Sequence, residues 1–233
     1  MKLIRILLIT GIIAFALLPF SSKAQFNPGS YNHCLEISAN NIILTGSFNG
    51  SSYFDASDFT ILVPKMKPGI GFGIEYGIVA LNGGSFDFAY RYSTCEYTTM
   101  YNDISGKTTT HVWQVLGGNA HFQKFSDKRL KPYIHFDLAF TFNRFDNVAY
   151  FKENPTELYS ARFAGFSVDV GPGLQYMLSP SLALDLRIVP GYHSKAGLKS
   201  KVKPKDINME ADELFGNFLL ISTFGLRYYF IKR

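Results

Sequence analysis

Charged residues are scarce in this chain. Asp, Glu, Lys and Arg make up 18% of its 233 residues, whereas a soluble domain carries about a quarter. Only 2 cysteines are present, which excludes a disulfide-rich scaffold and leaves too few for a cysteine-based metal site. The formal net charge of +5 is small. We therefore expect no nucleic-acid partner, no metal and no cofactor.

Long apolar runs are absent beyond the N-terminus, so no later stretch resembles a transmembrane helix. The chain opens with MKLIRILLITGIIAFALLPFSSKAQ, in which two basic residues precede an apolar run of 13 residues and a small-x-small SKA site. This order is typical of a secretory signal peptide. The sequence predicts a cleaved signal peptide over residues 1–24 and an exported domain over residues 25–233. Any insertion of that domain into a membrane would require a β-barrel.

Aromatic residues are abundant, at 16% of the chain, and apolar and polar residues alternate with the period of two that is typical of strands. No helical periodicity persists between the alternating stretches. We expect eight strands, approximately 31–44, 68–78, 85–97, 108–123, 132–143, 162–177, 181–193 and 215–230.

The connections between these strands alternate in length. Segments 45–67, 144–161 and 194–214 are long, whereas 79–84 and 178–180 are short. Transmembrane barrels have long outer loops and short periplasmic turns. The sequence therefore predicts an all-β fold, an eight-stranded antiparallel up-and-down transmembrane β-barrel with long outer loops and short periplasmic turns. A soluble barrel of the lipocalin kind also has eight strands and stays open as an alternative.

The segment YIHFDLAFTF at 133–142 illustrates the two faces. One parity carries Ile134, Phe136, Leu138, Phe140 and Phe142. The other parity carries His135 and Asp137, and the matching faces of other strands carry glycine, alanine and a few charges. Arginine with carboxylates suits a crowded lumen because the guanidinium is a planar group with five donors.

We predict that the apolar faces contact lipid and that the polar faces form a network in the lumen. The members of this network are Glu75, Asp87, Arg91, His135, Asp137, Asp169, Asp185, Arg187 and Arg227. The expected partners of His135 and Asp137 are Arg91 and either Arg187 or Arg227. Segment 108–123 alternates too poorly for its register to be assigned.

The last strand ends in TFGLRYYF, in which a glycine is followed by two aromatic residues at fixed spacing. This pattern resembles the terminal signature of bacterial outer-membrane barrels. With the export signal and the eight strands, the whole exported domain resembles a small Bacteroidetes outer-membrane β-barrel protein of the PorT-like family, similar in architecture to OmpA and OmpX. The resemblance implies an outer-membrane location and recognition of Gly225, Tyr228 and Phe230 by the barrel-assembly machinery.

Outer-membrane lipid and lipopolysaccharide are the expected surroundings, and the lysine-rich segment 195–205 could meet lipopolysaccharide phosphates. Acidic residues follow this segment and nearly balance it, so a solvated loop is the alternative. Cys34 and Cys95 are expected near opposite ends of the barrel and therefore as free thiols.

We expect a non-enzymatic barrel with a structural or accessory role in surface interaction, adhesion or secretion support. No Gly-x-Ser-x-Gly elbow or zinc-type histidine pair is present. Two alternatives stay open: a lipid-modifying enzyme that uses His193 and Ser194 at the outer rim, and a soluble lipocalin-like ligand carrier.

Overall fold

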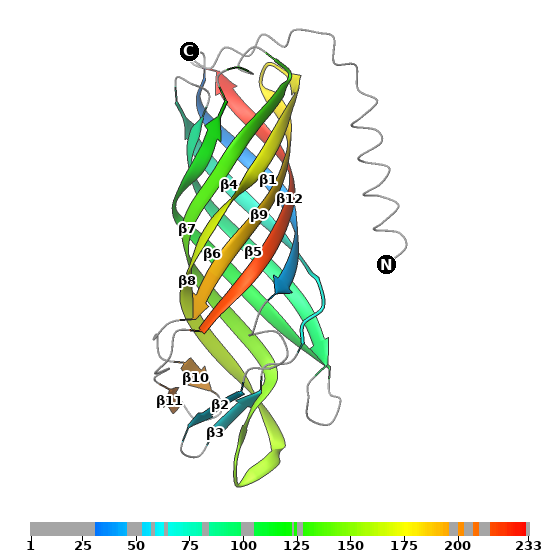
Figure 1. The fold of residues 1–233 in the computed structure, drawn as a ribbon, viewed down its shortest axis with the longest axis vertical. Coiled ribbons are helices and arrows are strands. Elements are labelled where there is room, and N and C mark those ends of the chain that lie inside the picture. The colour runs from blue at the N-terminus through cyan, green and yellow to red at the C-terminus, as the bar shows by residue number, and fades with distance from the viewer. Residues whose placement is uncertain are drawn as a thin grey trace.

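A computed structural model gives the fold of the chain (Figure 1). It describes residues 31–45, 53–56, 59–62, 65–80, 84–98, 105–122, 124, 128–195, 200–202, 207–209 and 215–231. The predicted signal peptide, residues 1–24, lies outside the described residues. Within the described residues, no helix has the length and apolar character needed to cross a membrane.

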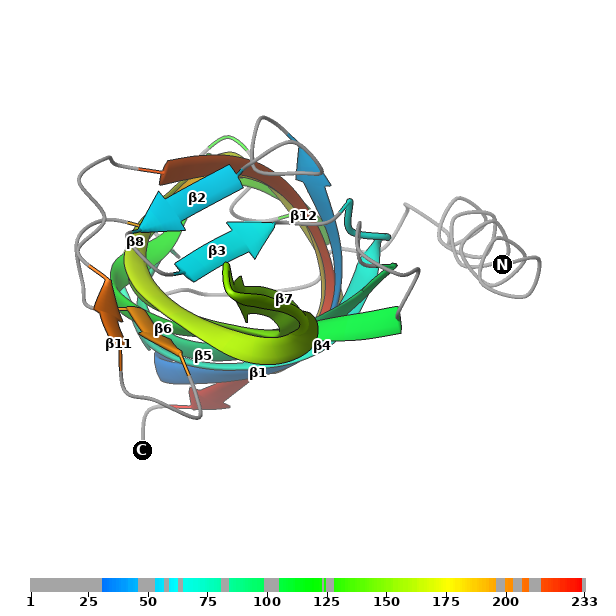
Figure 2. The same ribbon diagram turned by 90° about the horizontal axis from the view of Figure 1, so that it is seen from below.

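Eight long strands form the wall of a barrel, which Figure 2 shows in a view along its length. They are β1 (Tyr31–Thr45), β4 (Gly69–Val79), β5 (Ser85–Thr98), β6 (Ser105–His121), β7 (Leu130–Phe151), β8 (Asn154–Ser179), β9 (Leu182–Lys195) and β12 (Phe215–Ile231). Each strand pairs antiparallel with the next in this order, and β12 closes the ring on β1. The prediction of an eight-stranded antiparallel up-and-down barrel is confirmed, with strand positions close to those expected.

The barrel is polar inside and apolar outside. On β7, the five outward side chains from Ile134 to Phe142 are between 37% and 53% exposed, whereas His135 and Asp137 are each 1% exposed. At about 3.4 Å per residue and the usual strand tilt, this band covers about 20 Å along the barrel axis, close to the apolar height of a membrane barrel. The fold is therefore that of a transmembrane β-barrel.

Strand β6 explains why its register could not be read from the sequence. Its pairing with β7 shifts between Gln114 and Leu116, at a β-bulge. Val115 and Leu116 are consecutive, yet both are exposed on the outer face. A bulge inserts one extra residue, so the alternation changes parity within the strand.

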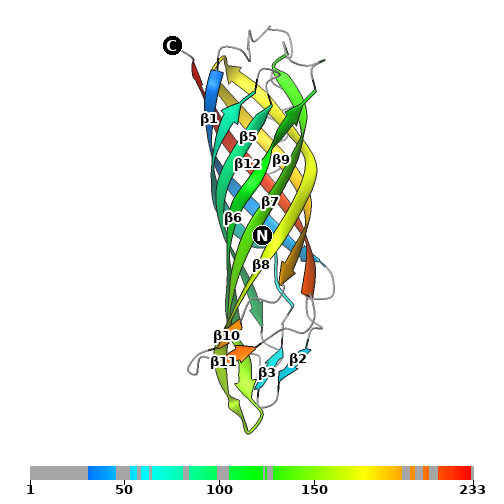
Figure 3. The same cartoon turned by 90° about the vertical axis from the view of Figure 1, so that its left-hand side faces the viewer.

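The two ends of the barrel differ (Figure 3). At the turn end, β8 and β9 are joined by Pro180 and Ser181 alone. At the opposite end, called the hairpin end, the predicted loop 144–161 is wrong: β7 continues to Phe151, and β8 begins at Asn154.

The period-two alternation that indicates a strand is interrupted in this hairpin. The pairing of β7 with β8 is irregular from Phe145 to Phe151, and Asn147 has a φ of 54°. Asparagine tolerates this conformation better than most residues. Short strands extend the sheet here: β3 (Phe59–Leu62) pairs with β7, and β2 (Tyr53–Ala56) pairs with β3. On the other side, β10 (Ser200–Val202) pairs with β8, and β11 (Ile207–Met209) pairs with β10. Two of the predicted long loops therefore contain strands.

Because the outer face is apolar, an arginine placed on it should destabilise the barrel by an amount that depends on its depth in the membrane. Leu138→Arg, at the middle of the apolar band, should lower the free energy of unfolding by about 2–4 kcal/mol, because a charge there must be buried in hydrocarbon. Ile70→Arg, in the register row beside the hairpin end, should cost about 0–1 kcal/mol. Urea unfolding of both variants in lipid vesicles measures the difference, and equal costs would contradict a lipid-facing band.

Candidate functional site

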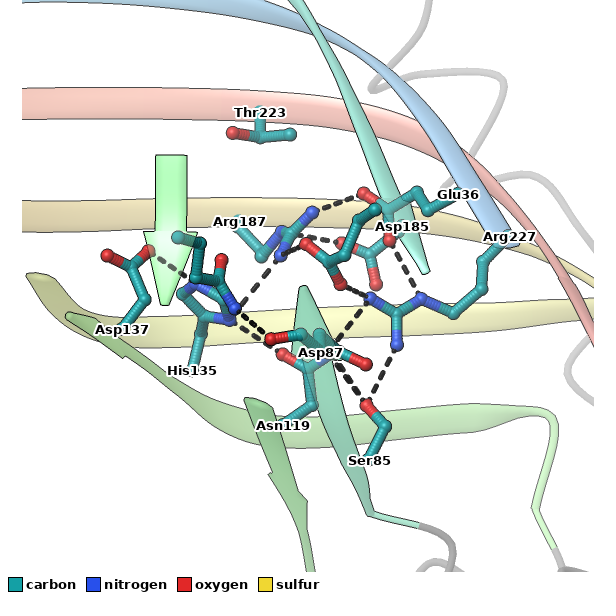
Figure 4. Close-up of polar contacts among 12 residues, drawn as sticks. Glu36, Ser85, Asp87, Asn119, His135, Asp137, Asp185, Arg187, Thr223 and Arg227 are labelled. Atoms are coloured by element: carbon teal, nitrogen blue, oxygen red, sulfur yellow. Dashed lines mark hydrogen bonds and ion pairs between the residues drawn. The ribbon is translucent and has the colours of Figure 1, made fainter. Parts of the chain in front are cut away.

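Two buried arginines and two buried glutamates form the centre of an ion network in the lumen (Figure 4). Arg187 of β9 donates from Nη1 to Glu75 Oε2 of β4 at 2.8 Å, and from Nη2 to Glu36 Oε1 of β1. Arg227 of β12 donates from Nε to Glu36 Oε2 at 2.8 Å, and from Nη2 to Glu75 Oε1. Each carboxylate therefore contacts both guanidinium groups. The ion pairs connect four strands through their side chains.

Asp87 of β5 extends this centre toward β6. Its Oδ2 accepts hydrogen bonds from Ser85 Oγ at 2.8 Å and from Asn119 Nδ2 at 3.0 Å. Arg227 Nη2 lies 3.6 Å from the same oxygen, and Arg227 Nη1 donates to Ser85 Oγ at 3.1 Å. The network thus reaches from β12 to β6.

His135 of β7 continues the network along the lumen. Its Nδ1 lies 2.8 Å from Asn119 Oδ1, and its Nε2 lies 3.1 Å from Asp137 Oδ2. Arg91 donates to the same Asp137 oxygen and to Gln114 Oε1, the latter at 2.9 Å. Arg91 is thus a partner of Asp137, and Arg187 Nη1 lies 3.4 Å from His135 Nδ1.

The structure places all nine residues of the predicted lumen set on the inner face. Asp185 lies 3.2 Å from Arg187 Nε through its Oδ1, which also accepts a hydrogen bond from Tyr133 Oη at 2.6 Å. Asp169 Oδ1 lies 3.0 Å from His193 Nε2. One lysine, Lys131, is also buried on the inner face of β7, where the sequence indicated only arginine as the basic residue.

Sequence reasoning missed Glu36, Ser85, Asn119 and Tyr133 as members of the network. The alternation of β1 does indicate Glu36, because Glu36, Ser38 and Asn40 share one parity. The structure shows that all three are buried. Asn119 follows the β6 bulge, so its face could not be deduced from simple alternation.

Glycine on the inner face provides the space for these long side chains. A Cβ atom on Gly225 would lie 2.6 Å from Glu36 Oε1, and one on Gly77 would lie 1.9 Å from Asp87 Oδ1. Gly225 belongs to the predicted assembly signal, and here it also makes room for the central glutamate. The two aromatic members of that signal, Tyr228 and Phe230, point outward at the turn end with ring centroids 5.1 Å apart.

His193 and Ser194 do not form a side-chain pair. Consecutive residues of a strand point to opposite faces, and His193 turns inward to Asp169. The geometry therefore gives no support to a nucleophile and base at these two positions. In the part of the chain that the structure describes, no group of three or more His, Cys, Asp or Glu side chains is arranged to hold a metal ion.

The lumen is apolar at the hairpin end. A buried cluster there contains Ile61, Met66, Cys95, Tyr97, Phe145, Val148, Ala149, Ala161 and Phe163. Tyr97 Oη donates to the carbonyl of Asp146 and lies 3.2 Å from that of Lys107. Between this cluster and the ion network, a cavity lined by Arg91, His193 and neighbouring residues measures only about 10 Å³, barely the volume of one water. Cys34 and Cys95 are both buried and free, and Cys34 contacts Asp87 in the network.

No protein-family model and no curated protein matches the chain. Among solved structures, it is similar to surface protein A of Neisseria, with 14% identity over 85% of this chain and 97% of that chain and a TM-score of 0.47. It is also similar to the outer membrane protein OprG from Pseudomonas aeruginosa, with 10% identity, 87% and 98% coverage and a TM-score of 0.48. The attachment invasion locus protein Ail of Yersinia pestis matches with 11% identity, 86% and 99% coverage and a TM-score of 0.43. These values describe a similar course of the chain and nothing about activity.

The central ion pairs predict a large effect of one neutral substitution. Glu36→Gln should lower the free energy of unfolding by about 3–5 kcal/mol, because two buried guanidinium groups lose one of their shared carboxylates. Asp146→Asn is the matched control: it removes a partner of Arg144 in a half-exposed pair and should cost about 0–1 kcal/mol. Urea unfolding in lipid vesicles tests both, and a similar loss in the two variants would contradict the role of the network.

Proposed function

We propose that this chain is a non-enzymatic integral outer-membrane protein whose barrel carries the hairpin end to the cell surface. The single observation behind the proposal is the inside-out polarity of a closed barrel, with apolar side chains outside and ion pairs inside. A closed barrel satisfies its backbone hydrogen bonds without water, as a bilayer requires. The predicted signal peptide over residues 1–24 would supply export.

The filled lumen favours a structural or accessory role over a general porin. Arg187 and Glu75 belong to strands three places apart in the ring, so their ion pair crosses the interior. The apolar cluster of Ile61, Tyr97 and their neighbours fills the hairpin end. An eight-stranded barrel has room for little more than its own side chains. We expect planar-bilayer recordings to give no porin-sized conductance.

The hairpin end offers the surface for partner contact. There, β7 and β8 continue beyond the apolar band, and β2, β3, β10 and β11 widen the sheet on both sides (Figure 1). Such a platform suits surface interaction, adhesion or secretion support. The PorT-like family remains our proposed assignment, and it rests on the terminal strand, the export signal and the strand layout. Recognition of Gly225, Tyr228 and Phe230 by the barrel-assembly machinery belongs to the same proposal.

The two alternatives have less support. A soluble carrier would leave Phe72, Phe136, Phe140 and the rest of the aromatic outer band in water, far beyond the apolar patch that soluble monomers expose. A rim enzyme based on His193 and Ser194 would need side chains that meet, whereas these point to opposite faces.

The orientation can be measured with single cysteines. Glu153→Cys, in the turn between β7 and β8, should react on intact cells with a maleimide that cannot cross membranes. Ser181→Cys, in the turn between β8 and β9, should react only after the outer membrane is permeabilised. The native Cys34 and Cys95 are buried and free, so the unsubstituted protein provides the background.

Two results would contradict the proposal. Equal labelling of both variants on intact cells would refute the orientation, and recovery of the protein in the aqueous periplasm without detergent would refute the membrane barrel. Extracted protein should also migrate differently on gels before and after heating.

A further inference from the structure

A pocket of about 490 Å³ opens near the hairpin end of the wall formed by β6, β7 and β8. Its outward-facing lining comes from two register rows. The row nearer the hairpin end contributes Thr109, Arg144 and Arg162, and the next row contributes His111, Phe142 and Ala164. The pocket is therefore cationic on one side and largely apolar on the other.

The cationic side consists of arginines placed directly opposite each other. Arg144 of β7 and Arg162 of β8 are register partners, and like charges in this position repel. Asp146 Oδ1 lies 3.1 Å from Arg144 Nε and offsets one charge. Among the residues that the structure describes, no carboxylate forms an ion pair with Arg162.

The apolar side joins the lipid-facing band. Phe142 is the last apolar residue of that band on β7, and Arg144 is the next outward residue. On β6, Trp113 follows His111 on the outer face, stands 54% exposed, and lies with its ring 4.7 Å from that of Tyr90. Arginines therefore begin where the hydrocarbon-facing surface ends, at the level of lipid headgroups.

We propose that this pocket binds an outer-leaflet lipid that carries an anionic phosphate. The phosphate lies between Arg144 and Arg162, whose planar donor groups suit phosphate oxygens, and it relieves the repulsion between them. The acyl chains extend past Phe142 toward Trp113. The site rests on the proposed function, because it requires the barrel to span the membrane.

Trp113 is the only tryptophan of the chain, so it reports on lipids beside the pocket. We would place the full-length exported domain in phosphatidylcholine nanodiscs and titrate in either dibrominated phosphatidic acid or dibrominated phosphatidylcholine with identical chains. Bromine quenches tryptophan at short range. The apparent affinity for phosphatidic acid should exceed that for phosphatidylcholine about fivefold or more, since each basic side chain at the surface attracts an anionic lipid to about that extent.

Two double variants make the comparison specific. Arg144→Gln with Arg162→Gln should abolish the preference for phosphatidic acid. Lys65→Gln with Lys67→Gln removes the same charge from exposed positions beside β4 and should retain the preference. Equal quenching by both lipids in the unsubstituted protein, or a preference that survives in the arginine variant, would overturn the site.

Other outcomes distinguish the membrane barrel from the lipid pocket. Trp113 fluorescence that neither lipid quenches would contradict the membrane barrel itself, whereas quenching without preference would contradict the pocket alone. Inorganic phosphate that fully abolishes the preference would indicate a site for the free ion and would overturn the lipid assignment.

Discussion

Closure of the sheet is the constraint on which the rest of the structure depends. A bilayer offers no water to the backbone, so an open strand edge would leave its N–H and C=O groups unpaired. The pairing of β1 with β12, from Tyr31 to Thr45, removes that edge. Closing only eight strands makes the barrel narrow. Every inward side chain must then find its partner in a small shared interior.

The ion network follows from this crowding and also helps to specify the fold. Buried charges are costly unless each has partners, and Glu36, Glu75, Arg187 and Arg227 supply partners to one another across four strands. A slip of β1 by one residue would turn Glu36 into lipid and bring Ile37, now 64% exposed, into the lumen. We infer that the network opposes register errors at the closing strand, where the barrel has no covalent turn between β1 and β12.

The sequence predicted the features that depend on alternation and missed those that depend on its interruption. Period-two patterning located the strands and the inward side of Asp137, and the lipid-facing side of Phe140 followed from it. The bulge in β6 changes parity at Val115 and Leu116, so neither its register nor Asn119 could be assigned. At the hairpin end the pairing of β7 with β8 is irregular, so the period-two pattern that indicates a strand is interrupted there. Alternation also does not identify the ion-pair partner of most charged residues, because partners such as Arg187 and Glu75 are 112 residues apart in the chain.

The two ends of the barrel carry different chemistry, and this difference links fold to function. At the turn end, Tyr228 and Phe230 face outward beside short connections, and the ion network lies within the lumen. At the hairpin end, the lumen is apolar, and the outer face changes from aromatic to cationic between Phe142 and Arg144. Because the lumen is apolar there, β3 packs into it through Ile61 and makes no demand on the buried charges of the ion network. Arg144 and Arg162 face outward and share no ion pair with Glu36, Glu75, Arg187 or Arg227, so we expect substitutions at these two arginines to leave the ion network in place.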